Sequence, residues 1–215
     1  MKLLAIDTST SRATIALSNG DVVYTDEQEG LKAHAQLLLP MIEKILIKAS
    51  LSLGQLDGIV FGCGPGSFTG LRITCSIAKA LAYAHNLPLY PVSSLDAIAS
   101  EVYFIQPQDS VPCLAVLDAR MQQLYWAYYE KSCNTPCVQV TNASDIIIPS
   151  SKPLILAGVG FETYLSELSP NLQVLRQLEV YPNASAMIRL VKAGSIHAVT
   201  IAEATPVYVR NSVTS

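Results

Sequence analysis

Charged side chains are scarce in this 215-residue sequence, and the basic ones form no cluster. Asp, Glu, Lys and Arg make up 14% of the chain, and the formal net charge is −3. A protein that holds nucleic acid by itself usually carries a basic face that neutralises phosphates. The sequence therefore argues against nucleic-acid binding by the isolated chain, and another subunit would have to hold most of any RNA.

Potential metal ligands are also few and scattered. The three histidines, His34, His85 and His197, stand far apart in the sequence, with no second ligand at a suitable spacing. Cys133 and Cys137 are four residues apart, but no second pair completes the four ligands of a structural zinc site. The five cysteines are odd in number and irregularly spaced, which argues against a disulfide framework. We predict no metal site and reduced, mostly buried thiols.

Long hydrophobic runs are missing as well, although half of the residues are hydrophobic. No run reaches the length that a membrane-spanning helix needs. The apolar start at residues 3–6 is stopped by Asp7, too early for a signal peptide. The composition is that of a core-rich globular protein, which we expect in the cytoplasm.

Hydrophobic patterning predicts an α/β protein. Asn19-Gly20 is a strong hairpin turn between two apolar runs. The segment 106–109 is the best candidate for a domain joint, which divides the chain into residues 1–107 and 108–215. Strands are predicted at residues 3–6, 13–17, 22–25, 58–62, 89–92, 111–117, 123–129 and 154–157. Helices are predicted at residues 33–50, 71–85, 95–103, 161–168 and 184–193.

Two of the predicted helices have unusual surfaces. In helix 33–50, Leu37 and Leu39 widen the apolar stripe beyond what one core face needs, and Pro40 lies in or near its first turns. Such a helix is either deeply buried or faces a partner. Helix 71–85 is rich in small residues that allow close approach by another element. Asn86 is a plausible C-cap of that helix, and Ser93 or Ser94 a plausible N-cap of the next.

A glycine-rich loop between a predicted strand and helix is the strongest local signal. A helix that follows such a loop can offer backbone N–H groups to an anion. No Lys follows the last glycine, so the loop is not a Walker A motif, and the serine is misplaced for a nucleophile elbow. From chemistry alone we favour a tight connection made for packing. The loop consists of Gly64, Pro65, Gly66, Ser67, Phe68, Thr69 and Gly70.

The two halves of the sequence repeat one short pattern. A strand ending in Asp7 and a strand ending in Asp118 are each followed by a polar turn and a second strand. This repeat indicates a duplicated fold. Neither turn has the glycine that lets a backbone approach phosphate closely, and the second contains the bulky Arg120 and Met121. A nucleotide site at these turns would be degenerate.

Several strings resemble the TsaB (YeaZ) family. The most specific is Phe61-Gly62-Cys63-Gly64-Pro65-Gly66-Ser67-Phe68-Thr69-Gly70-Leu71-Arg72. The runs Leu4-Ala5-Ile6-Asp7-Thr8-Ser9, His34-Ala35-Gln36-Leu37-Leu38-Leu39-Pro40, Pro91-Val92-Ser93-Ser94-Leu95 and Asp118-Ala119-Arg120 follow the same family in order. The resemblance implies an actin-like ATPase (ASKHA, RNase H-like) fold, with two structurally related subdomains and mixed sheets flanked by helices.

The resemblance also implies a role. The family's members are non-catalytic paralogues of TsaD, which transfers a threonylcarbamoyl group to N6 of adenosine 37 in tRNA, with the ATPase TsaE. In TsaD a His-x-x-x-His pair binds a metal; here Ser94 and Ile98 stand at those positions, and neither suits a transition metal. The resemblance implies no catalytic residues, Asp7 and Asp118 as a vestigial nucleotide site, and no tightly bound cofactor, with ATP and magnesium only in the assembled complex.

Partners follow from the same resemblance. It implies a heterodimer with a TsaD-type subunit, a TsaE-type ATPase as further partner, a homodimer in isolation, and contact with tRNA only through the complex. The partner surface would use the helices predicted at residues 33–50 and 71–85. Its residues would be His34, Leu37, Leu38, Met41, Arg72, Cys75, Ser76 and Lys79.

Two alternatives remain open. The chain could be a small-molecule kinase or ATPase of the actin-like superfamily, in which Asp7 and Asp118 position magnesium. It could also be a metallopeptidase, but no His-x-x-x-His or Ser/His/Asp set supports that activity.

Overall fold

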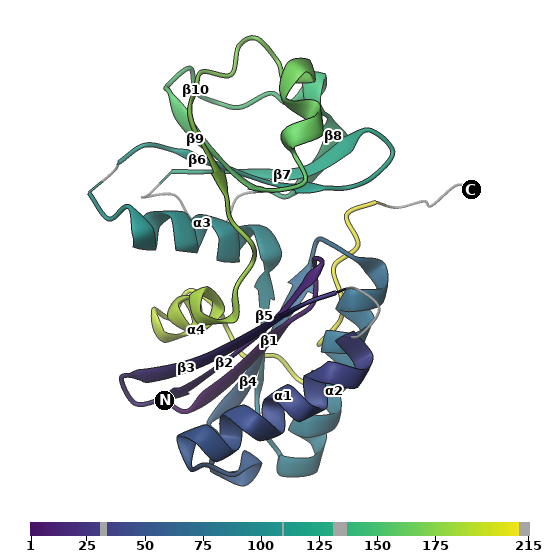
Figure 1. Cartoon of the computed structure of the whole chain (residues 1–215), viewed down its shortest axis with the longest axis vertical. Coiled ribbons are helices and arrows are strands. Elements are labelled where there is room, and N and C mark those ends of the chain that lie inside the picture. The colour runs from purple at the N-terminus through teal and green to yellow at the C-terminus, as the bar shows by residue number, and fades with distance from the viewer. Residues whose placement is uncertain (31–33, 109, 131–136, 211–215) are drawn as a thin grey trace.

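Two five-stranded mixed sheets, one in each half of the chain, organise the molecule (Figure 1). The computed structural model describes residues 1–30, 34–108, 110–130 and 137–210. The first sheet has the order β3-β2-β1-β4-β5 and comprises β1 (Leu3–Asp7), β2 (Arg12–Asn19), β3 (Val22–Glu29), β4 (Gly58–Gly64) and β5 (Leu89–Ser93). The second has the order β10-β9-β6-β7-β8 and comprises β6 (Cys113–Asp118), β7 (Gln123–Tyr129), β8 (Gln139–Asn142), β9 (Leu154–Val159) and β10 (Val174–Glu179).

The two sheets repeat one plan. Read from its other edge, the second sheet runs β8-β7-β6-β9-β10, so each strand matches a counterpart in the first. In the first sheet, β3-β2 and β2-β1 pair antiparallel, and β1-β4 and β4-β5 pair parallel. In the second sheet, β8-β7 and β7-β6 pair antiparallel, and β6-β9 and β9-β10 pair parallel. The second hairpin is one residue tighter, because Asp7 pairs with Thr14 whereas Asp118 pairs with Leu124. The predicted fold class is confirmed as an α/β chain of two related subdomains, each with a mixed sheet flanked by helices.

Helices cover both sides of the first sheet. Leu4 and Ile6 face α1 (His34–Ala49) and α2 (Phe68–His85), whereas Leu3 and Ala5 face α4 (Ala184–Lys192). Successive side chains of a strand point to opposite faces, so β1 fits between two helical layers because residues 3–6 are all apolar. Every residue of β1 and of β4 is buried.

The second sheet packs on α3 (Ser94–Ile105) through one face. Leu95, Ile98 and Val102 lie there against buried residues of β6 and β9. The other face is covered by irregular segments and by the short 3-10 helices η3 (Ala143–Asp145) and η4 (Glu162–Glu167). A third 3-10 helix, η2 (Leu53–Gln55), follows α1. Figure 1 places α3 and α4 between the sheets, where Arg189 and Glu101 form an ion pair that joins the two helices.

The last part of the chain returns to the first sheet. Helix α4 lies on that sheet, Val199 bridges Leu89, and the backbone N–H of Val207 donates to the carbonyl of Cys63 at 2.7 Å. The predicted division between residues 107 and 108 separates the two sheets. As a division into domains it stays a prediction, and residues 184–210 pack with the N-terminal sheet despite lying in the predicted C-terminal half.

Local sequence signals account for most element boundaries. Gly20 has a φ of +63° in the two-residue turn between β2 and β3, as the Asn19-Gly20 pair predicts. Asn86 ends α2 in the left-handed conformation, and the Ser93 hydroxyl accepts from the N–H of Leu95 at the start of α3. The helix predicted at about residues 161–168 forms, but as the 3-10 helix η4 rather than as an α-helix. None of the helices in the described ranges is long and apolar enough to cross a membrane.

Candidate functional site

The glycine-rich loop packs directly onto the turn that follows β1. The backbone N–H of Ser67 donates to the carbonyl of Ser9 at 2.7 Å, and the Thr8 hydroxyl donates to the carbonyl of Gly70 at 2.8 Å. A Cβ atom on Gly70 would lie 1.8 Å from the carbonyl oxygen of Thr8, and one on Gly66 would lie 2.3 Å from that of Ser9. Both glycines are therefore needed for close backbone approach. The structure supports the packing interpretation of this loop.

Asp7 is sealed beneath this contact. Its Oδ1 accepts hydrogen bonds from the N–H and the hydroxyl of Ser9, at 3.0 and 2.8 Å. Its Oδ2 faces Gly62, where a Cβ atom would lie only 1.7 Å away, and it is buried with no hydrogen-bond partner among the described residues. Burial raises the pKa of this carboxyl to about 6. In this conformation Asp7 is directed into the protein and does not fit a magnesium ion with its nucleotide.

Asp118, its counterpart, lies in a more open setting. Its Oδ1 accepts from the N–H of Arg120 at 2.8 Å and from the hydroxyl of Tyr164 at 3.0 Å. Its Oδ2 lies 3.3 Å from the Arg120 guanidinium. A Cβ atom on Gly160 would lie 2.7 Å from the Cβ of Asp118, so in this subdomain too a glycine presses against the aspartate. That Asp7 and Asp118 are the vestige of a nucleotide site stays a prediction.

The residues at the family's metal positions belong to the core. Ser94 and Ile98 are both fully buried in α3. No three His, Cys, Asp or Glu side chains gather as a metal site would need in the part of the chain that the structure describes. Cys133, one of the paired cysteines, lies outside the described residues. The absence of a metal stays a prediction.

The predicted partner residues fall into two groups. Leu38, Met41 and Cys75 are buried in the chain's own core, so in this conformation a partner could not reach their side chains directly. Leu37 and Lys79 are partly buried, whereas Arg72 and Ser76 are exposed. The side chain of His34 lies outside the described residues. For the accessible residues the partner role stays a prediction. On α1, apolar periodicity could not separate the buried Leu38 and Met41 from the more accessible Leu37, because core and interface positions are both apolar.

The exposed side of α1 and α2 is nevertheless rich in apolar residues. Leu39 and Ile47 of α1 and Tyr83 of α2 are exposed, and Pro40 is exposed beside Leu39. The widened stripe predicted for this helix is therefore real at Leu39, whereas Leu37 packs against the core. Exposed apolar residues of this size are candidates for a protein contact surface.

The chain's own C-terminal tail occupies part of α2, which sequence reasoning missed. Lys79 Nζ donates to the carbonyl of Ala204 at 3.2 Å, and Arg72 Nε donates to the hydroxyl of Tyr208 at 3.2 Å. Cys75 Sγ also lies 3.5 Å from the Ala204 carbonyl. The apolar pair Val207-Tyr208 so close to the chain end was the only available signal, and spacing alone could not tell where it docks.

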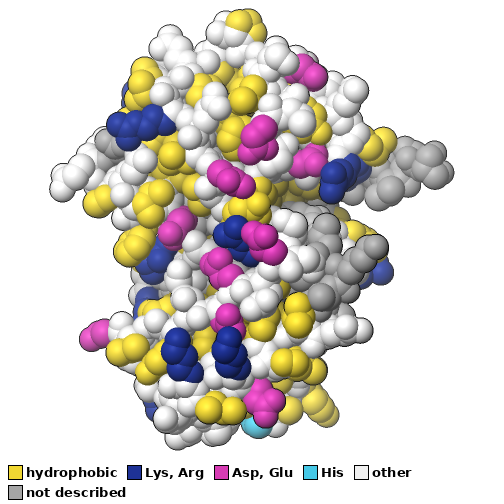
Figure 2. All heavy atoms as spheres, in the orientation of Figure 1, with side chains coloured by type: hydrophobic (Ala, Val, Ile, Leu, Met, Phe, Trp, Pro, Cys, Tyr) yellow, Lys and Arg dark blue, Asp and Glu magenta, His cyan; other side chains and the backbone are white. Residues whose placement is uncertain are grey.

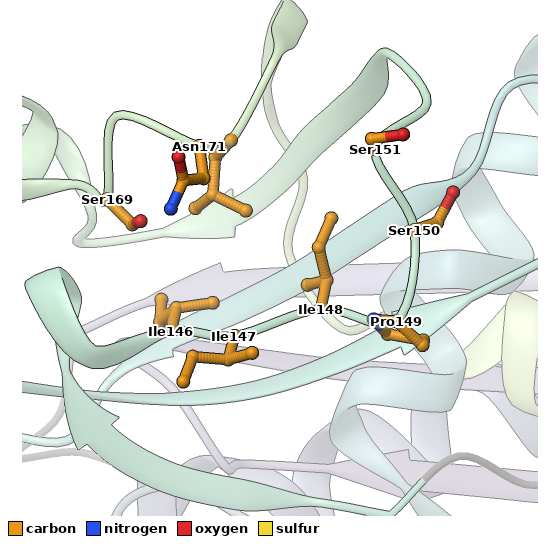
Figure 3. Close-up of a pocket in the computed structure, with 9 residues that line it drawn as sticks. Ile146, Ile147, Ile148, Pro149, Ser150, Ser151, Ser169 and Asn171 are labelled. Carbon is orange, nitrogen blue, oxygen red and sulfur yellow. The ribbon is translucent and has the colours of Figure 1, made fainter.

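A pocket of about 310 Å³ lies in the second subdomain, far from these residues in the sequence (Figure 3). The segment before β9 forms one wall, and the loop before β10 brings Ser169 and Asn171 to the other. Its lining contains serine hydroxyls but no acid, base or thiol, so it offers no group that would activate them as nucleophiles. The lining residues are Ile146, Ile147, Ile148, Pro149, Ser150, Ser151, Ser169, Asn171 and Leu172.

Comparison with known proteins identifies the family. A family model described as TsaD, tRNA N6-adenosine threonylcarbamoyltransferase, matches residues 23–167. The tRNA threonylcarbamoyladenosine biosynthesis protein TsaB of Haemophilus influenzae is 31% identical, over 100% of this chain and 95% of its own length. TsaB of Escherichia coli is 32% identical, over 99% and 96%. The chain belongs to the TsaB family.

Solved structures agree with this family assignment. A crystal structure of an uncharacterized Pseudomonas aeruginosa protein, described as similar to the peptidase YeaZ, superposes with a TM-score of 0.87 at 30% identity. It covers 97% of this chain and 99% of its own. YeaZ of the same organism gives a TM-score of 0.84 at 29% identity, with 96% and 99% covered. The recognition of a TsaB family member from its sequence strings is confirmed.

Proposed function

We propose that the chain is an accessory subunit in the formation of threonylcarbamoyladenosine at position 37 of tRNA, non-catalytic by itself. Its relation to TsaB proteins over the full length is the observation that carries this proposal. The burial of Asp7 beneath the packed turn supports it, and so do Ser94 and Ile98, because a buried serine and an isoleucine do not suit a transition metal.

The catalytic step would then reside in a TsaD-type paralogue, with which this chain forms a heterodimer, and a TsaE-type ATPase would complete the complex in the cytoplasm. The exposed apolar residues Leu39, Ile47 and Tyr83 support a contact through α1 and α2, which could also join two copies of the chain when no partner is present. Basic and acidic side chains are interspersed on the face that Figure 2 shows. With a net charge of −3, this supports tRNA contact mainly through the partner.

Reconstitution tests this proposal. The catalytic paralogue, the ATPase, threonylcarbamoyl-adenylate and tRNA are combined with and without this chain, and modified adenosine 37 is measured by mass spectrometry. We expect modification to collapse without the chain, and the chain alone to be inactive. Equal modification without the chain would refute the role.

An interface variant makes the test specific. Leu39→Asp places a charge on the exposed side of α1, where the wild-type side chain is 54% exposed, so the fold should tolerate it. Ile147→Asp is the matched control in the second subdomain, at 82% exposure. We expect Leu39→Asp to abolish co-elution with the catalytic paralogue and Ile147→Asp to leave it intact. The reverse pattern would place the contact on the other subdomain.

A kinase or ATPase of the actin-like superfamily is the second candidate, supported by the duplicated hairpins that end in Asp7 and Asp118. Calorimetry with ATP and magnesium on the isolated chain tests it. Binding that is lost in Asp7→Ala would favour an enzyme, whereas no heat of binding would count against it.

A further inference from the structure

The C-terminal tail connects the two subdomains along one side of the molecule. Figure 1 shows it rising past α2 toward the second sheet. Val207 is anchored to Cys63 at the end of β4, and the ring of Tyr208 lies 5.3 Å from that of Phe68. Two residues later, the Arg210 guanidinium donates to Met121 Sδ at 3.2 Å, in the turn between β6 and β7, and to Oε1 of Gln123, the first residue of β7. The tail thus joins the glycine-rich loop to the second hairpin.

These contacts assemble an exposed surface from three separate segments, which we call the tail surface. Its apolar members are between 45% and 66% exposed. Single exposed apolar residues are ordinary, but a contiguous group of them marks an interaction site. Aromatic residues, Met and Arg are the types enriched in the centres of protein interfaces. The tail surface consists of Phe68, Arg72, Met121, Val207, Tyr208 and Arg210.

The two arginines of the tail surface carry charges that no carboxylate neutralises among the described residues. Arg72 lies over the ring of Phe68, with its central carbon 3.9 Å from the ring centroid, and also donates to Tyr208. Arg210 bonds a thioether and an amide. By contrast, Arg120 and Arg189 each pair with a carboxylate. Two unneutralised guanidinium groups around an apolar centre would complement carboxylates on a partner.

The turn that presents Met121 has a strained backbone. Arg120, Met121 and Gln122 have φ values of +61°, +55° and +62°, a conformation that side chains other than glycine rarely adopt. The equivalent turn after Asp7 contains no positive φ angle. Strain of this kind persists where surrounding contacts hold it and is concentrated at functional sites. Here the contacts of Arg210 with Met121 and Gln123 hold the turn.

We propose that the tail surface is a docking site for a protein partner that presents an apolar side chain flanked by carboxylates. The rings of Phe68 and Tyr208 could stack on a base, but a protein is favoured over RNA because the same surface exposes the apolar Met121 and Val207 and the chain has a net charge of −3. The inference rests on the proposed function only for the choice of partners to test. This docking site extends the partner surface proposed on α1 and α2 to the C-terminal tail and to the second subdomain.

Affinity measurements on full-length variants test this proposal. Arg210→Glu reverses one unneutralised charge, and Met121→Ser removes the apolar side chain that Arg210 contacts. Lys152→Glu is the matched charge control, on an exposed loop of the second subdomain. Each variant is titrated against the catalytic paralogue and against the ATPase by biolayer interferometry at low and high salt, after its fold is checked by thermal melting.

We expect Arg210→Glu and Met121→Ser to weaken binding of one of these partners at least tenfold, with the Arg210 effect shrinking at high salt. Lys152→Glu should bind as wild type. If the wild-type chain binds a partner and both variants bind that partner with the same affinity, this inference is overturned but the proposed function is not. If the wild-type chain binds neither partner, the proposed function is refuted as well. Loss of tRNA affinity in the assembled complex, with protein affinities unchanged, would overturn it in favour of an RNA site.

Discussion

The buried carboxyl of Asp7 makes the stability of this protein depend on pH in an unusual direction. Burial raises its pKa from the ordinary value of 3.8 to about 6. The folded state therefore holds the proton more tightly than the unfolded chain does. Well below pH 3.8 the carboxyl is neutral in both states, so its ionisation does not change the free energy of unfolding. As pH rises through 6 the folded protein must carry a buried charge, so stability is lost as pH rises.

The size of this effect follows from the shift. About two pKa units correspond to roughly 3 kcal/mol in full, of which about 1.4 kcal/mol develops between pH 5 and pH 8. Asp7→Asn keeps an Oδ1 acceptor for Ser9 and removes the charge. Its amide nitrogen replaces an Oδ2 that has no hydrogen-bond partner among the described residues, and the cost of burying that amide does not vary with pH. We therefore expect the free energy of unfolding of Asp7→Asn, relative to wild type, to rise by about 1.4 kcal/mol from pH 5 to pH 8.

Urea denaturation of wild type and Asp7→Asn at several pH values measures this difference. Carbon-13 NMR of the Asp7 carboxyl gives the titration directly, with a midpoint expected near pH 6. In Ser9→Ala the midpoint should move higher, because the Ser9 hydroxyl donates to the charged form and holds the pKa down. A midpoint at or below pH 4, or a stability difference independent of pH, would refute the reasoning.

Three further predictions concern packing and polar contacts. Gly70→Ala should cost about 3 kcal/mol of unfolding free energy in chemical denaturation, because its Cβ would collide with the Thr8 carbonyl; Gly54→Ala, whose Cβ would meet its nearest atom at an ordinary 3.8 Å, should change it little. Tyr129→Phe removes the 2.6 Å hydrogen bond to Asp96 and should cost about 2 kcal/mol, while the pKa of Asp96, already raised by burial, rises further in an NMR titration. Leu4→Ala empties a fully buried position under α1 and α2 and should cost about 3 kcal/mol by thermal melting, whereas Leu175→Ala at the exposed edge strand β10 should not.

Local chemistry made much of this fold predictable. The turn at Asn19-Gly20, the C-cap at Asn86 and the N-cap at Ser93 are each fixed by one or two residues, so the sequence specifies them directly. Strands β8 and β10 were missed. Both are short and at the edges of the second sheet, and β10 (Val174–Glu179) is largely exposed and polar, so neither has the apolar run that identifies a strand.

Contacts between distant segments were the part that the sequence could not supply. Nothing in residues 184–192 indicates that α4 packs on the first sheet, because its apolar stripe would fit either sheet. The same holds for Leu38 and Met41, whose apolar character suits a core or a partner surface equally. The resemblance to the TsaB family located the helices of interest, but only burial distinguishes the residues that a partner can reach.

The duplicated hairpins diverge in a way that bears on function. In the first subdomain the glycine-rich loop packs over Asp7 so closely that a Cβ atom at Gly62, Gly66 or Gly70 would collide with its neighbours. In the second, Asp118 remains accessible but is neutralised by Arg120. In the kinase or ATPase alternative both aspartates would position magnesium, whereas in this conformation Asp7 is buried and Asp118 is paired with Arg120. The exposed surfaces of the two subdomains are unaffected by these closures, and the accessory role that we propose would use those surfaces.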